Sequence, residues 1–430
     1  MMPTVAFHHF GCKVNFSEAS ALSRQFLAKG YRLAGFHDKA DIYVISSCAV
    51  TSTAEKKCKA AIRQAHMLNP LARIAVIGCF PELNHKEIAG MEGVEIVLGH
   101  QGKFRLLEVL EGKNPVEREG TPIKNPDFIP SYSVGDRTRS FLKIQDGCDY
   151  HCAYCAIPLA RGSSRSDTIS HLLREARVIL TTGIREIVLT GVNIGDFGKQ
   201  NGETFLELLS RFNREIDIPR IRISSIEPDL LSDGIIELIA ASEKILPHFH
   251  IPLQSGSNEI LRSMKRKYTR ELYADRVQKV RAHMPEACVA TDVIAGFPGE
   301  KENHFLETVT FLESLPVSYM HVFTYSRREN TPASNASGTV PGAEKKRRSD
   351  MLHHLSDEKK MAFYLANRGK PASVLFESDR KEGMMHGFTG NYIRVKTPFD
   401  PSLINEIRTV MLEELCPDHS YLWLPSSPRH

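Results

Sequence analysis

Short apolar runs alternate with amphipathic helical patterns along most of this chain, and this alternation restricts its fold more than any other feature. In the first hundred residues, one helical pattern runs from Ser17 to Lys29 and a second from about Thr53 to Leu68. Strands that are apolar along their whole length are typical of a parallel sheet that is covered on both faces. These residues therefore predict an N-terminal parallel α/β sheet domain, with strands at "TVAFHHF", "ADIYVISS" and "ARIAVIG".

The alternation resumes at Phe141 and continues through six strand–helix units. Six consecutive units of this kind predict a partial (βα)6 barrel of the TIM type, whose functional residues lie at the C-terminal ends of the strands. The predicted strands are "FLKIQ", "EIVLTG", "RIRISSI", "HFHIPL", "CVATDVIAG" and "YMHVFTYS", and the helices lie near 168–182, 203–215, 232–242, 269–283 and 300–315.

A polar, proline-rich link from Lys113 to Ser140 separates these two regions. After the second region comes a basic helix capped by Gly369, and beyond it the pattern changes to short strands and turns. The tail therefore predicts a small C-terminal β-barrel. The resulting domain prediction is residues 1–125, 138–368 and 370–430.

Composition restricts the class of protein further. No apolar run approaches the roughly 18 residues that a membrane span needs, and the N-terminus lacks a secretory pattern, so we expect a cytoplasmic protein without membrane contact. Nine cysteines, an odd number, favour metal or reactive-thiol chemistry over a disulfide framework. The net charge of +4 permits a nucleic-acid partner without requiring one.

Three cysteines stand together in "DGCDYHCAYCAIP", at Cys148, Cys152 and Cys155. Thiolates this close suit zinc or an iron–sulfur cluster. Structural zinc requires four ligands, and the nearby candidate, His151, would compete with its neighbour Cys152. A [4Fe–4S] cluster held by three cysteines leaves one iron with an open coordination position, which suits a site that binds a further molecule.

Three other cysteines, Cys12, Cys48 and Cys79, each follow one of the first three predicted strands. Residues just beyond the ends of parallel strands share one edge of the sheet, where ligand sites form. We therefore expect these cysteines to form a second cluster in space, although each alone would suit a buried apolar position. The remaining cysteines, Cys58, Cys288 and Cys416, are interpreted as ordinary thiols.

The cysteine loop resembles the CxxxCxxC loop of the radical S-adenosylmethionine (SAM) enzymes, including the aromatic Tyr154 before the last cysteine. The wider string "KIQDGCDYHCAYCAIPLARGSSRS" resembles the methylthiotransferase branch of that superfamily. The C-terminal tail occupies the place of this family's TRAM module, an RNA-binding β-barrel. The resemblance covers nearly the whole chain, through "GCKVN", "SSCAVT", "IGCFPE", "LTGVNIG", "RISSIEP", "HIPLQSGS", "MKRKYT" and "DVIAGFPGE".

The resemblance implies two [4Fe–4S] clusters and SAM as cofactors. Cys148, Cys152 and Cys155 would hold the cluster that binds SAM, and Cys12, Cys48 and Cys79 the cluster that carries the transferred sulfur. One SAM would donate a methyl group, and another would yield the radical that removes hydrogen from an unactivated carbon. Asn193, Glu227 and Gln254 lie at or beyond predicted strand ends within matching motifs, and we assign them, with Tyr154, to SAM binding. The chain departs from the family where "NTC" is replaced by Ser46-Ser47-Cys48 and "GCYAQ" by "GCFPEL".

The dipeptide Lys13-Val14 in "GCKVN" resembles the branch that converts N6-threonylcarbamoyladenosine at position 37 of tRNA to its 2-methylthio derivative. The implied partners are the tRNA anticodon stem-loop, an electron donor of flavodoxin or ferredoxin type, and a sulfur donor. Segment 261–283, with eight basic and two acidic residues, is either a solvated helix face or a phosphate-binding surface. Three alternatives stay open: methylthiolation of N6-isopentenyladenosine, methylthiolation of a ribosomal-protein aspartate, and a non-enzymatic RNA-binding protein with iron–sulfur or zinc.

Overall fold

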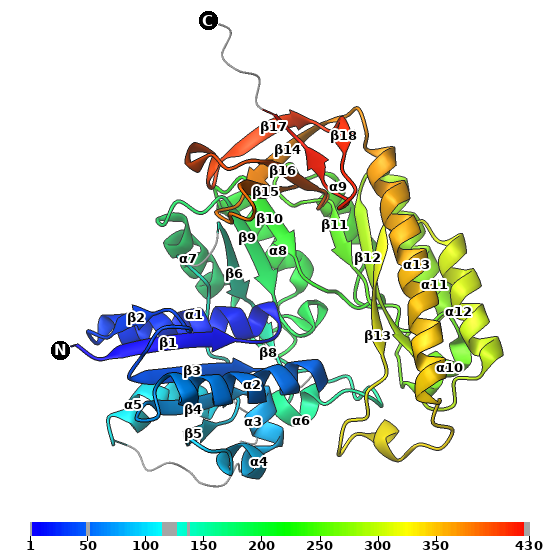
Figure 1. The fold of residues 1–430 in the computed structure, drawn as a ribbon. Helices are drawn as coiled ribbons and strands as arrows, with labels where there is room; N and C mark the ends of the chain where they lie inside the picture. The colour runs from blue at the N-terminus through cyan, green and yellow to red at the C-terminus, as the bar shows by residue number, and fades with distance from the viewer. Residues whose placement is uncertain (1, 49–51, 114–126, 136–137, 425–430) are drawn as a thin grey trace, which may run out of the picture.

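The computed structural model describes residues 2–48, 52–113, 127–135 and 138–424. Its N-terminal part is a five-stranded parallel sheet in the order β2-β1-β3-β4-β5, with helices on both faces (Figure 1). One face packs against α1 (Lys13–Ala28) and α5 (Leu106–Leu110), and the other against α2 (Ser52–Leu68), α3 (Cys79–Leu83) and α4 (His85–Ala89). The strands are β1 (Thr4–His9), β2 (Arg32–Ala34), β3 (Ile42–Ser47), β4 (Arg73–Gly78) and β5 (Val94–Leu98).

The central part is a half-barrel of six parallel strands in chain order. Two three-stranded sheets, β6-β9-β10 and β11-β12-β13, are joined by bridges from Ile221 to Ile245 and from Ser225 to His250. The strands are β6 (Arg139–Lys143), β9 (Glu186–Thr190), β10 (Arg220–Ile223), β11 (His248–His250), β12 (Cys288–Ala295) and β13 (Tyr319–Thr324). The partial (βα)6 barrel predicted from the sequence is confirmed.

Alternate residues of each strand face the helices that cover the outside of the half-barrel. Leu142, Ile187, Ile221, Phe249 and Val289 belong to this outer core. The residues between them therefore face the concave inner side. The covering helices are α7 (Ile169–Leu180), α8 (Phe205–Glu215), α9 (Asp233–Ala240), α11 (Arg270–His283) and α12 (Glu302–Ser314), with the shorter α10 (Asn258–Ser263) between β11 and α11.

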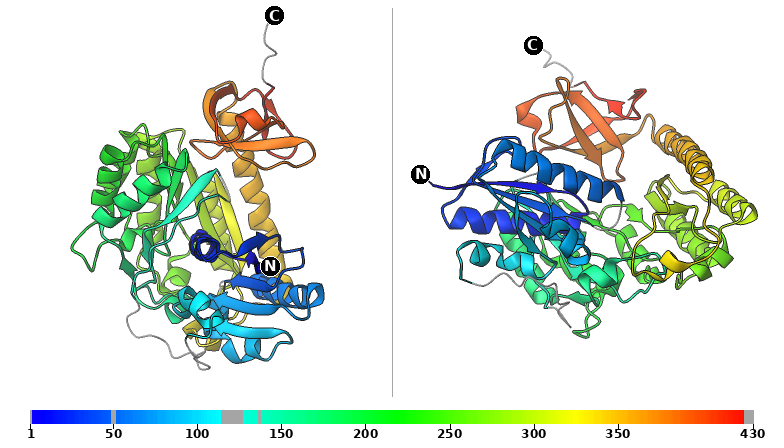
Figure 2. Two further views of the ribbon diagram at one scale, coloured as in Figure 1. Left: turned by 90° about the vertical axis from the view of Figure 1, so that its left-hand side faces the viewer. Right: turned by 60° about the horizontal axis from the view of Figure 1, so that its bottom comes forward.

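The long helix α13 (Gly342–Ala366) packs along β13 and leads to the C-terminal part (Figure 2). The tail forms a curled six-stranded sheet in the order β17-β14-β15-β16-β19-β18, so the predicted all-β module is confirmed. It covers the end of the half-barrel where the strands begin (Figure 1). Its strands are β14 (Pro371–Phe376), β15 (Met384–Thr389), β16 (Arg394–Pro398), β17 (Ile407–Met411), β18 (Glu414–Leu415) and β19 (Tyr421–Leu422).

The predicted strands all form, and the helix boundaries shift by only a few residues. The largest shift is at α1, which begins at Lys13 rather than Ser17. Strands β2 and β5 were not predicted. Most of the proline-rich link, the boundary predicted at residue 125, and residues 49–51 of "SSCAVT" lie outside the described residues. Among the described helices, none has the length and apolar character required to cross a membrane.

Candidate functional site

A tight loop at the C-terminal end of the first barrel strand holds Cys148, Cys152 and Cys155. The loop lies between β7 (Gln145–Asp146) and α6 (Ile157–Arg161), and β8 (Arg165–Ser166) pairs back onto β7. Gly147 begins the loop with a φ of +67°, and a Cβ atom there would lie 1.9 Å from the carbonyl oxygen of Ser163. Only glycine suits this position, because both the backbone angle and the space exclude a side chain.

Each sulfur of this loop accepts one hydrogen bond. The Tyr150 N–H donates to Cys148 Sγ at 3.4 Å, and the Ile157 N–H donates to Cys155 Sγ at 3.5 Å. The Arg266 guanidinium donates to Cys152 Sγ at 3.1 Å. Hydrogen bonds to sulfur are a usual way in which proteins tune iron–sulfur clusters, so this donor set fits a cluster.

The spacing of the cysteine sulfurs argues against a single zinc ion. Within the described parts of the chain, no three cysteine sulfurs lie within 4.8 Å of one another. Zinc–sulfur bonds of about 2.3 Å would bring all the sulfurs of one zinc site closer together than that. A cluster distributes its thiolates over several iron atoms and therefore accommodates the wider spacing.

Arg266 connects the loop to two of the predicted SAM-binding residues. Its guanidinium lies 3.3 Å from the Tyr154 hydroxyl and pairs with the Glu227 carboxylate. Burial raises the pKa of Glu227 to about 7, although Arg266 opposes this rise. Glu227 and Tyr154 thus both contact the guanidinium that donates to Cys152.

Asn193 and Gln254 also lie beyond the C-terminal ends of barrel strands. Gln145 accepts hydrogen bonds from the N–H groups of Val192 and Asn193, at 2.9 and 2.8 Å, and donates to the carbonyl of Gly147. The side-chain oxygen of Asn193 is buried and has no hydrogen-bond partner among the described residues. Gln254 has a φ of +67°, and its N–H donates to the Asp292 carbonyl at 2.7 Å. An orphaned amide oxygen and a strained backbone next to the cysteine loop are typical of a ligand site.

The N-terminal cysteines share one edge of their sheet, as the strand pattern predicted. Cys12, Cys48 and Cys79 follow the adjacent strands β1, β3 and β4. A Cβ atom on Gly11 would lie 2.7 Å from Cβ of Cys48, so the turn that carries Cys12 contacts Cys48 directly. Cys48 and Cys79 are buried, whereas Cys12 is exposed.

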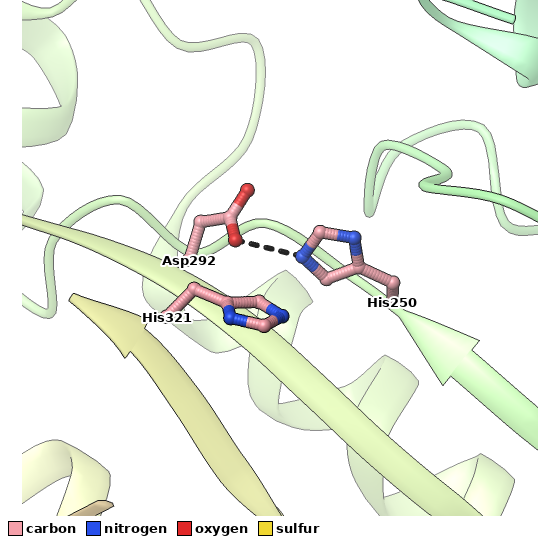
Figure 3. A group of neighbouring side chains, drawn as sticks. All are labelled: His250, Asp292 and His321. Atoms are coloured by element: carbon pink, nitrogen blue, oxygen red, sulfur yellow. Dashed lines mark hydrogen bonds and ion pairs between the residues drawn. The ribbon is translucent and has the colours of Figure 1, made fainter. Parts of the chain in front are cut away.

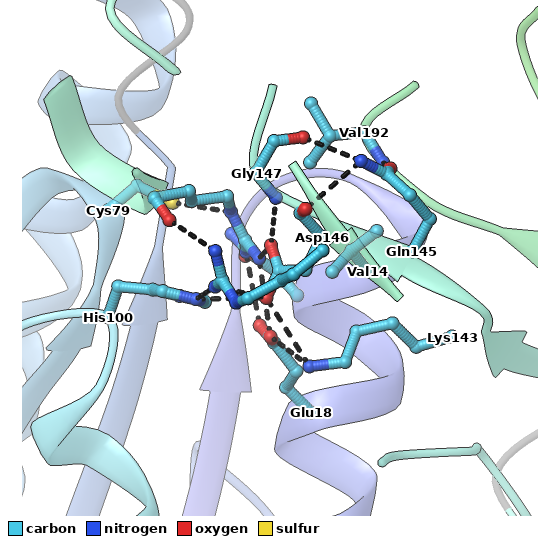
Figure 4. A network of polar contacts seen from close by, with 12 residues as sticks. Val14, Glu18, Cys79, His100, Lys143, Gln145, Asp146, Gly147 and Val192 are labelled. Atoms are coloured by element: carbon cyan, nitrogen blue, oxygen red, sulfur yellow. Dashed lines mark hydrogen bonds and ion pairs between the residues drawn. The ribbon is translucent and has the colours of Figure 1, made fainter. Parts of the chain in front are cut away.

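Arg161 joins the two cysteine sets. It is the last residue of α6, which begins two residues after Cys155, and its Nε donates to Cys79 Sγ at 3.1 Å (Figure 4). Its other nitrogens donate to Asn15 and to the carboxylates of Glu18 and Asp146. One buried guanidinium therefore contacts both the N-terminal sheet domain and strand β7, which leads into the loop of Cys148, Cys152 and Cys155.

The contacts of Arg161 belong to a buried ion network between the two domains. Lys103 Nζ donates to Glu18 at 2.5 Å and Lys143 Nζ donates to Glu18 at 3.1 Å, while Arg165 donates to Asp146 at 3.0 Å. Glu18, His100 and Asp146 lie close enough together for a metal ion, but Lys103, Lys143, Arg161 and Arg165 neutralise them. We interpret this network as the structural joint between the domains.

A third polar group lies on the inner face of the half-barrel (Figure 3). His250 Nε2 lies 2.7 Å from Asp292 Oδ1, and His250 Nδ1 lies 2.5 Å from Ser225 Oγ. The His321 ring stands edge-on to the His250 ring, with 5.3 Å between the centroids. The His321 side chain is exposed, so solvent reaches this part of the inner face.

The remaining sequence interpretations have mixed outcomes. Cys58 and Cys288 are fully buried in apolar cores, and burial raises their pKa values to about 11 and about 12, in agreement with ordinary thiols. Several basic side chains of segment 261–283 form ion pairs or hydrogen bonds with other parts of the chain. Arg276 and Lys279 pair with Asp233, and Arg281 donates to the carbonyls of Pro285, Ala287 and Pro316.

Sequence reasoning missed Arg161 and Arg266 as site residues. Both stand inside motifs that carried the family resemblance, "CAIPLARG" and "MKRKYT". Their position in a matching motif was the available signal. Neither lies at a strand end, so the topological argument that found Glu227 and Gln254 passed over them.

The fold and the cysteine loop define a radical SAM protein. Residues 142–312 match the Radical SAM superfamily, and residues 4–99 match the Uncharacterized protein family UPF0004. The fold is similar to the radical S-adenosylmethionine methyltransferase TsrM from Kitasatospora setae, with a TM-score of 0.57 and 14% identity over 78% of this chain and 77% of that one.

Similarity in sequence identifies the family. The chain is 38% identical to the threonylcarbamoyladenosine tRNA methylthiotransferase MtaB of Bacillus subtilis, over 96% of this chain and 94% of that protein. It is 32% identical to the tRNA-2-methylthio-N(6)-dimethylallyladenosine synthase of Oceanobacillus iheyensis, over 94% of this chain and 81% of that protein. The chain belongs to the radical SAM methylthiotransferase family, whose cofactors are [4Fe–4S] clusters and SAM.

Proposed function

We propose that this protein is a transferase that installs a methylthio group at C2 of N6-threonylcarbamoyladenosine at position 37 of tRNA. The observation that carries the proposal is the link through Arg161, which brings two separate cysteine sets to one domain boundary. Relatives from Bacillus subtilis and Aquifex aeolicus, at 38% and 36% identity, bear the name of this activity. A tRNA substrate is also consistent with the expected cytoplasmic location.

In this proposal each cysteine set holds one [4Fe–4S] cluster. Cys148, Cys152 and Cys155 hold the cluster that binds SAM, and their three hydrogen-bond donors stabilise the thiolates. Cys12, Cys48 and Cys79 hold the second cluster at the edge of the N-terminal sheet. When bound, the clusters and SAM supply the one-electron chemistry on an unreactive C–H bond and the methyl and sulfur that are transferred.

Four side chains around the cysteine loop would orient SAM. The unpaired oxygen of Asn193 accepts a hydrogen bond from a cationic group of the ligand, and the Glu227 carboxylate accepts hydrogen bonds beside Cys152. Gln254 offers its amide from a backbone that β12 holds in a positive φ. Tyr154, packed against Phe297 with 6.4 Å between the ring centroids, borders the same space with its ring.

The domain division follows from this assignment. We propose residues 1–125 as the domain of the second cluster, 138–368 as the radical SAM domain and 370–430 as a TRAM-like module that contacts the tRNA anticodon stem-loop. The reaction also consumes electrons and sulfur, so we propose an electron donor of flavodoxin or ferredoxin type and a sulfur donor as partners.

Anaerobic reconstitution tests the proposal directly. The wild-type protein should bind about eight iron atoms per chain. Replacing either cysteine set by alanines should remove half of the iron and all of the product. With tRNA that carries N6-threonylcarbamoyladenosine, nucleoside mass spectrometry should detect the 2-methylthio derivative. If replacing one cysteine set removed the iron from both sites, the proposal of two independent clusters would be contradicted.

The second candidate substrate is N6-isopentenyladenosine in tRNA, which the relatives at about 32% identity favour. The same reconstituted protein, offered tRNA with either modification, separates the two. We expect product only from the threonylcarbamoyl substrate. A ribosomal-protein aspartate should give no product. One zinc per chain and no SAM cleavage would instead indicate a non-enzymatic RNA-binding protein.

A further inference from the structure

Lys13 places a cation from the N-terminal domain at the inner face of the half-barrel. It is the first residue of α1, which packs against β6. Phe16, one helical turn further on, stacks edge-on against Phe141 with 5.4 Å between the centroids, and both rings contact Val188. Phe141, Val188 and Arg222 are neighbours across adjacent strands and face inward. Lys13 therefore begins the helix face that points into the half-barrel.

The electrostatic surroundings of Lys13 agree with this position. Burial and the charges of Arg222 and Arg139 lower the pKa of Lys13, so its ammonium lies near the inward-facing side chains of β6 and β10. Lys13 in turn contributes to the lowered pKa values of His248 and His321, which stand on β11 and β13. Lys13 therefore interacts electrostatically with groups on β6 and β10 and with groups on β11 and β13.

This part of the inner face has more positive than negative charge. Arg139 pairs with Glu377, and Arg220 and Arg222 share Glu186. Within the described part of the chain, the Lys13 ammonium forms no hydrogen bond or ion pair. Lys13 and the three arginines therefore face the carboxylates of Glu186 and Glu377, while Asp292, also on the inner face, is paired with His250. Among these four cations of the described residues, the half-buried Lys13 is the one without a partner. An anion from outside the chain would complete the set.

The candidate substrate supplies such an anion. The threonylcarbamoyl group ends in a carboxylate, whereas the isopentenyl group carries no charge. C2 of adenine, where the methylthio group is installed, and C6, which bears the N6 substituent, both adjoin the ring nitrogen N1. Lys13 is next to Cys12, so a base with C2 directed at the second cysteine set would hold its N6 substituent within reach of Lys13.

We propose that Lys13 is the specificity-determining residue of this enzyme and binds the threonyl carboxylate of the substrate nucleoside. The inference rests on the proposed function and adds the residue that distinguishes the two candidate substrates. His321, which is exposed on strand β13, is close enough to Lys13 for the lysine charge to lower its pKa.

The test uses reconstituted full-length protein and two anticodon stem-loops. One carries N6-threonylcarbamoyladenosine and the other its carboxamide, which keeps the shape and removes the charge. Wild type should prefer the carboxylate by about 10- to 100-fold in kcat/KM, because a charge-assisted contact would be lost. Lys13→Gln should lose most of the activity on the carboxylate and little on the carboxamide. Lys13→Arg should retain the preference. Lys29→Gln, at the exposed far end of the same helix, should match wild type.

Iron content and 5′-deoxyadenosine formation are measured for every variant. A Lys13→Gln protein that keeps its iron, cleaves SAM and no longer distinguishes the two stem-loops supports the proposal. Unchanged discrimination, or iron lost in proportion to activity, overturns it. A further result would also overturn it: one divalent metal ion per chain that remains after both cysteine sets are removed and is lost in His321→Ala. His250 and His321 would then be metal ligands. If wild type acts on neither stem-loop but on the isopentenyl substrate, the proposed function itself fails.

Discussion

At the scale of single residues, two arginines organise the candidate site. Arg161 donates both to Cys79 and to the carboxylates of Glu18 and Asp146, and Arg266 donates both to Cys152 and to Glu227. A guanidinium suits this role because its planar fork offers five donors with a permanent charge. Each arginine therefore positions a sulfur and a carboxylate at once.

Replacing Arg161 by methionine should destabilise the whole protein. The change leaves Glu18 and Asp146 buried with less compensating charge, which typically costs about 3–5 kcal/mol. Urea denaturation of the reconstituted protein measures this loss. Arg211→Met, at a partly exposed surface pair with Glu215, should leave the midpoint unchanged. Equal midpoints for the two variants would contradict a structural role for the buried network.

His100 should make stability depend on pH. Burial, together with Lys103, lowers its pKa to about 3, and in the network Nδ1 accepts from Lys103 while Nε2 lies 2.9 Å from both Asp146 and Arg165. The unfolded chain protonates this histidine near pH 6.5, whereas the folded chain does not. Stability should therefore fall as pH drops from about 6.5 toward 3, by at most about 1.4 kcal/mol per pH unit from this group.

The comparison of wild type with His100→Gln isolates this effect. Urea denaturation at pH 7 and pH 5 should give a smaller difference for the variant, because glutamine does not titrate. The two carboxylates of the network titrate below this range and cancel in the comparison. The same pH dependence in both proteins would mean that His100 accepts a proton in the folded state.

At the scale of elements, the strands could be predicted from the sequence, whereas the contacts that join distant elements could not. Strands β3, β4 and β9 form where an apolar run predicted them, because nearly all of their residues are buried on both faces. β2 was missed because it has three residues and lies at the sheet edge. The pairs Arg161–Glu18 and Arg220–Phe388 join residues more than a hundred positions apart, and such pairing leaves no local periodicity in the sequence.

The candidate site shows the same division. Cys148, Cys152 and Cys155 could be grouped from their spacing in the sequence. Cys12, Cys48, Cys79 and the strand-end residues could be placed because parallel strands bring their C-terminal ends to one edge. Topology places residues only at that edge. The direction in which Lys13 points depends on how two domains pack, and that of Arg266 depends on contacts between distant parts of the half-barrel. The inward position of Lys13 therefore emerged only from the contact of α1 with β6.

The cysteine loop allows a prediction at this scale. Gly147→Ala should distort the loop, since the new Cβ would collide with the Ser163 carbonyl oxygen in addition to straining φ. The variant should lose about half of its iron and all SAM cleavage. Gly183→Ala is the matched control, because its φ is +79° but nothing lies within 4 Å of the added Cβ. It should keep its iron and cost about 1 kcal/mol.

At the scale of the whole molecule, the tail sheet is part of the structural core. Arg220 donates to the carbonyls of Phe388 and Ser373, and Arg222 to that of Gly390. Cys288 of β12 shares one apolar cluster with residues of α13 and of the tail strands. The C-terminal module therefore completes the half-barrel at the end opposite the cysteine loop, in addition to any contact with RNA.

Truncation after residue 369 tests this view. A tail that served only to bind RNA would leave the thermal midpoint unchanged and weaken tRNA binding alone. We expect the truncated protein to melt lower by about 5 °C or more, since its core loses apolar partners and two buried guanidinium groups lose their carbonyl acceptors in the tail. Differential scanning fluorimetry of the reconstituted proteins measures the shift, with the exposed substitution Lys381→Gln as the control. An unchanged midpoint in the truncated protein would show that the tail does not stabilise the rest of the fold and serves only in RNA recognition.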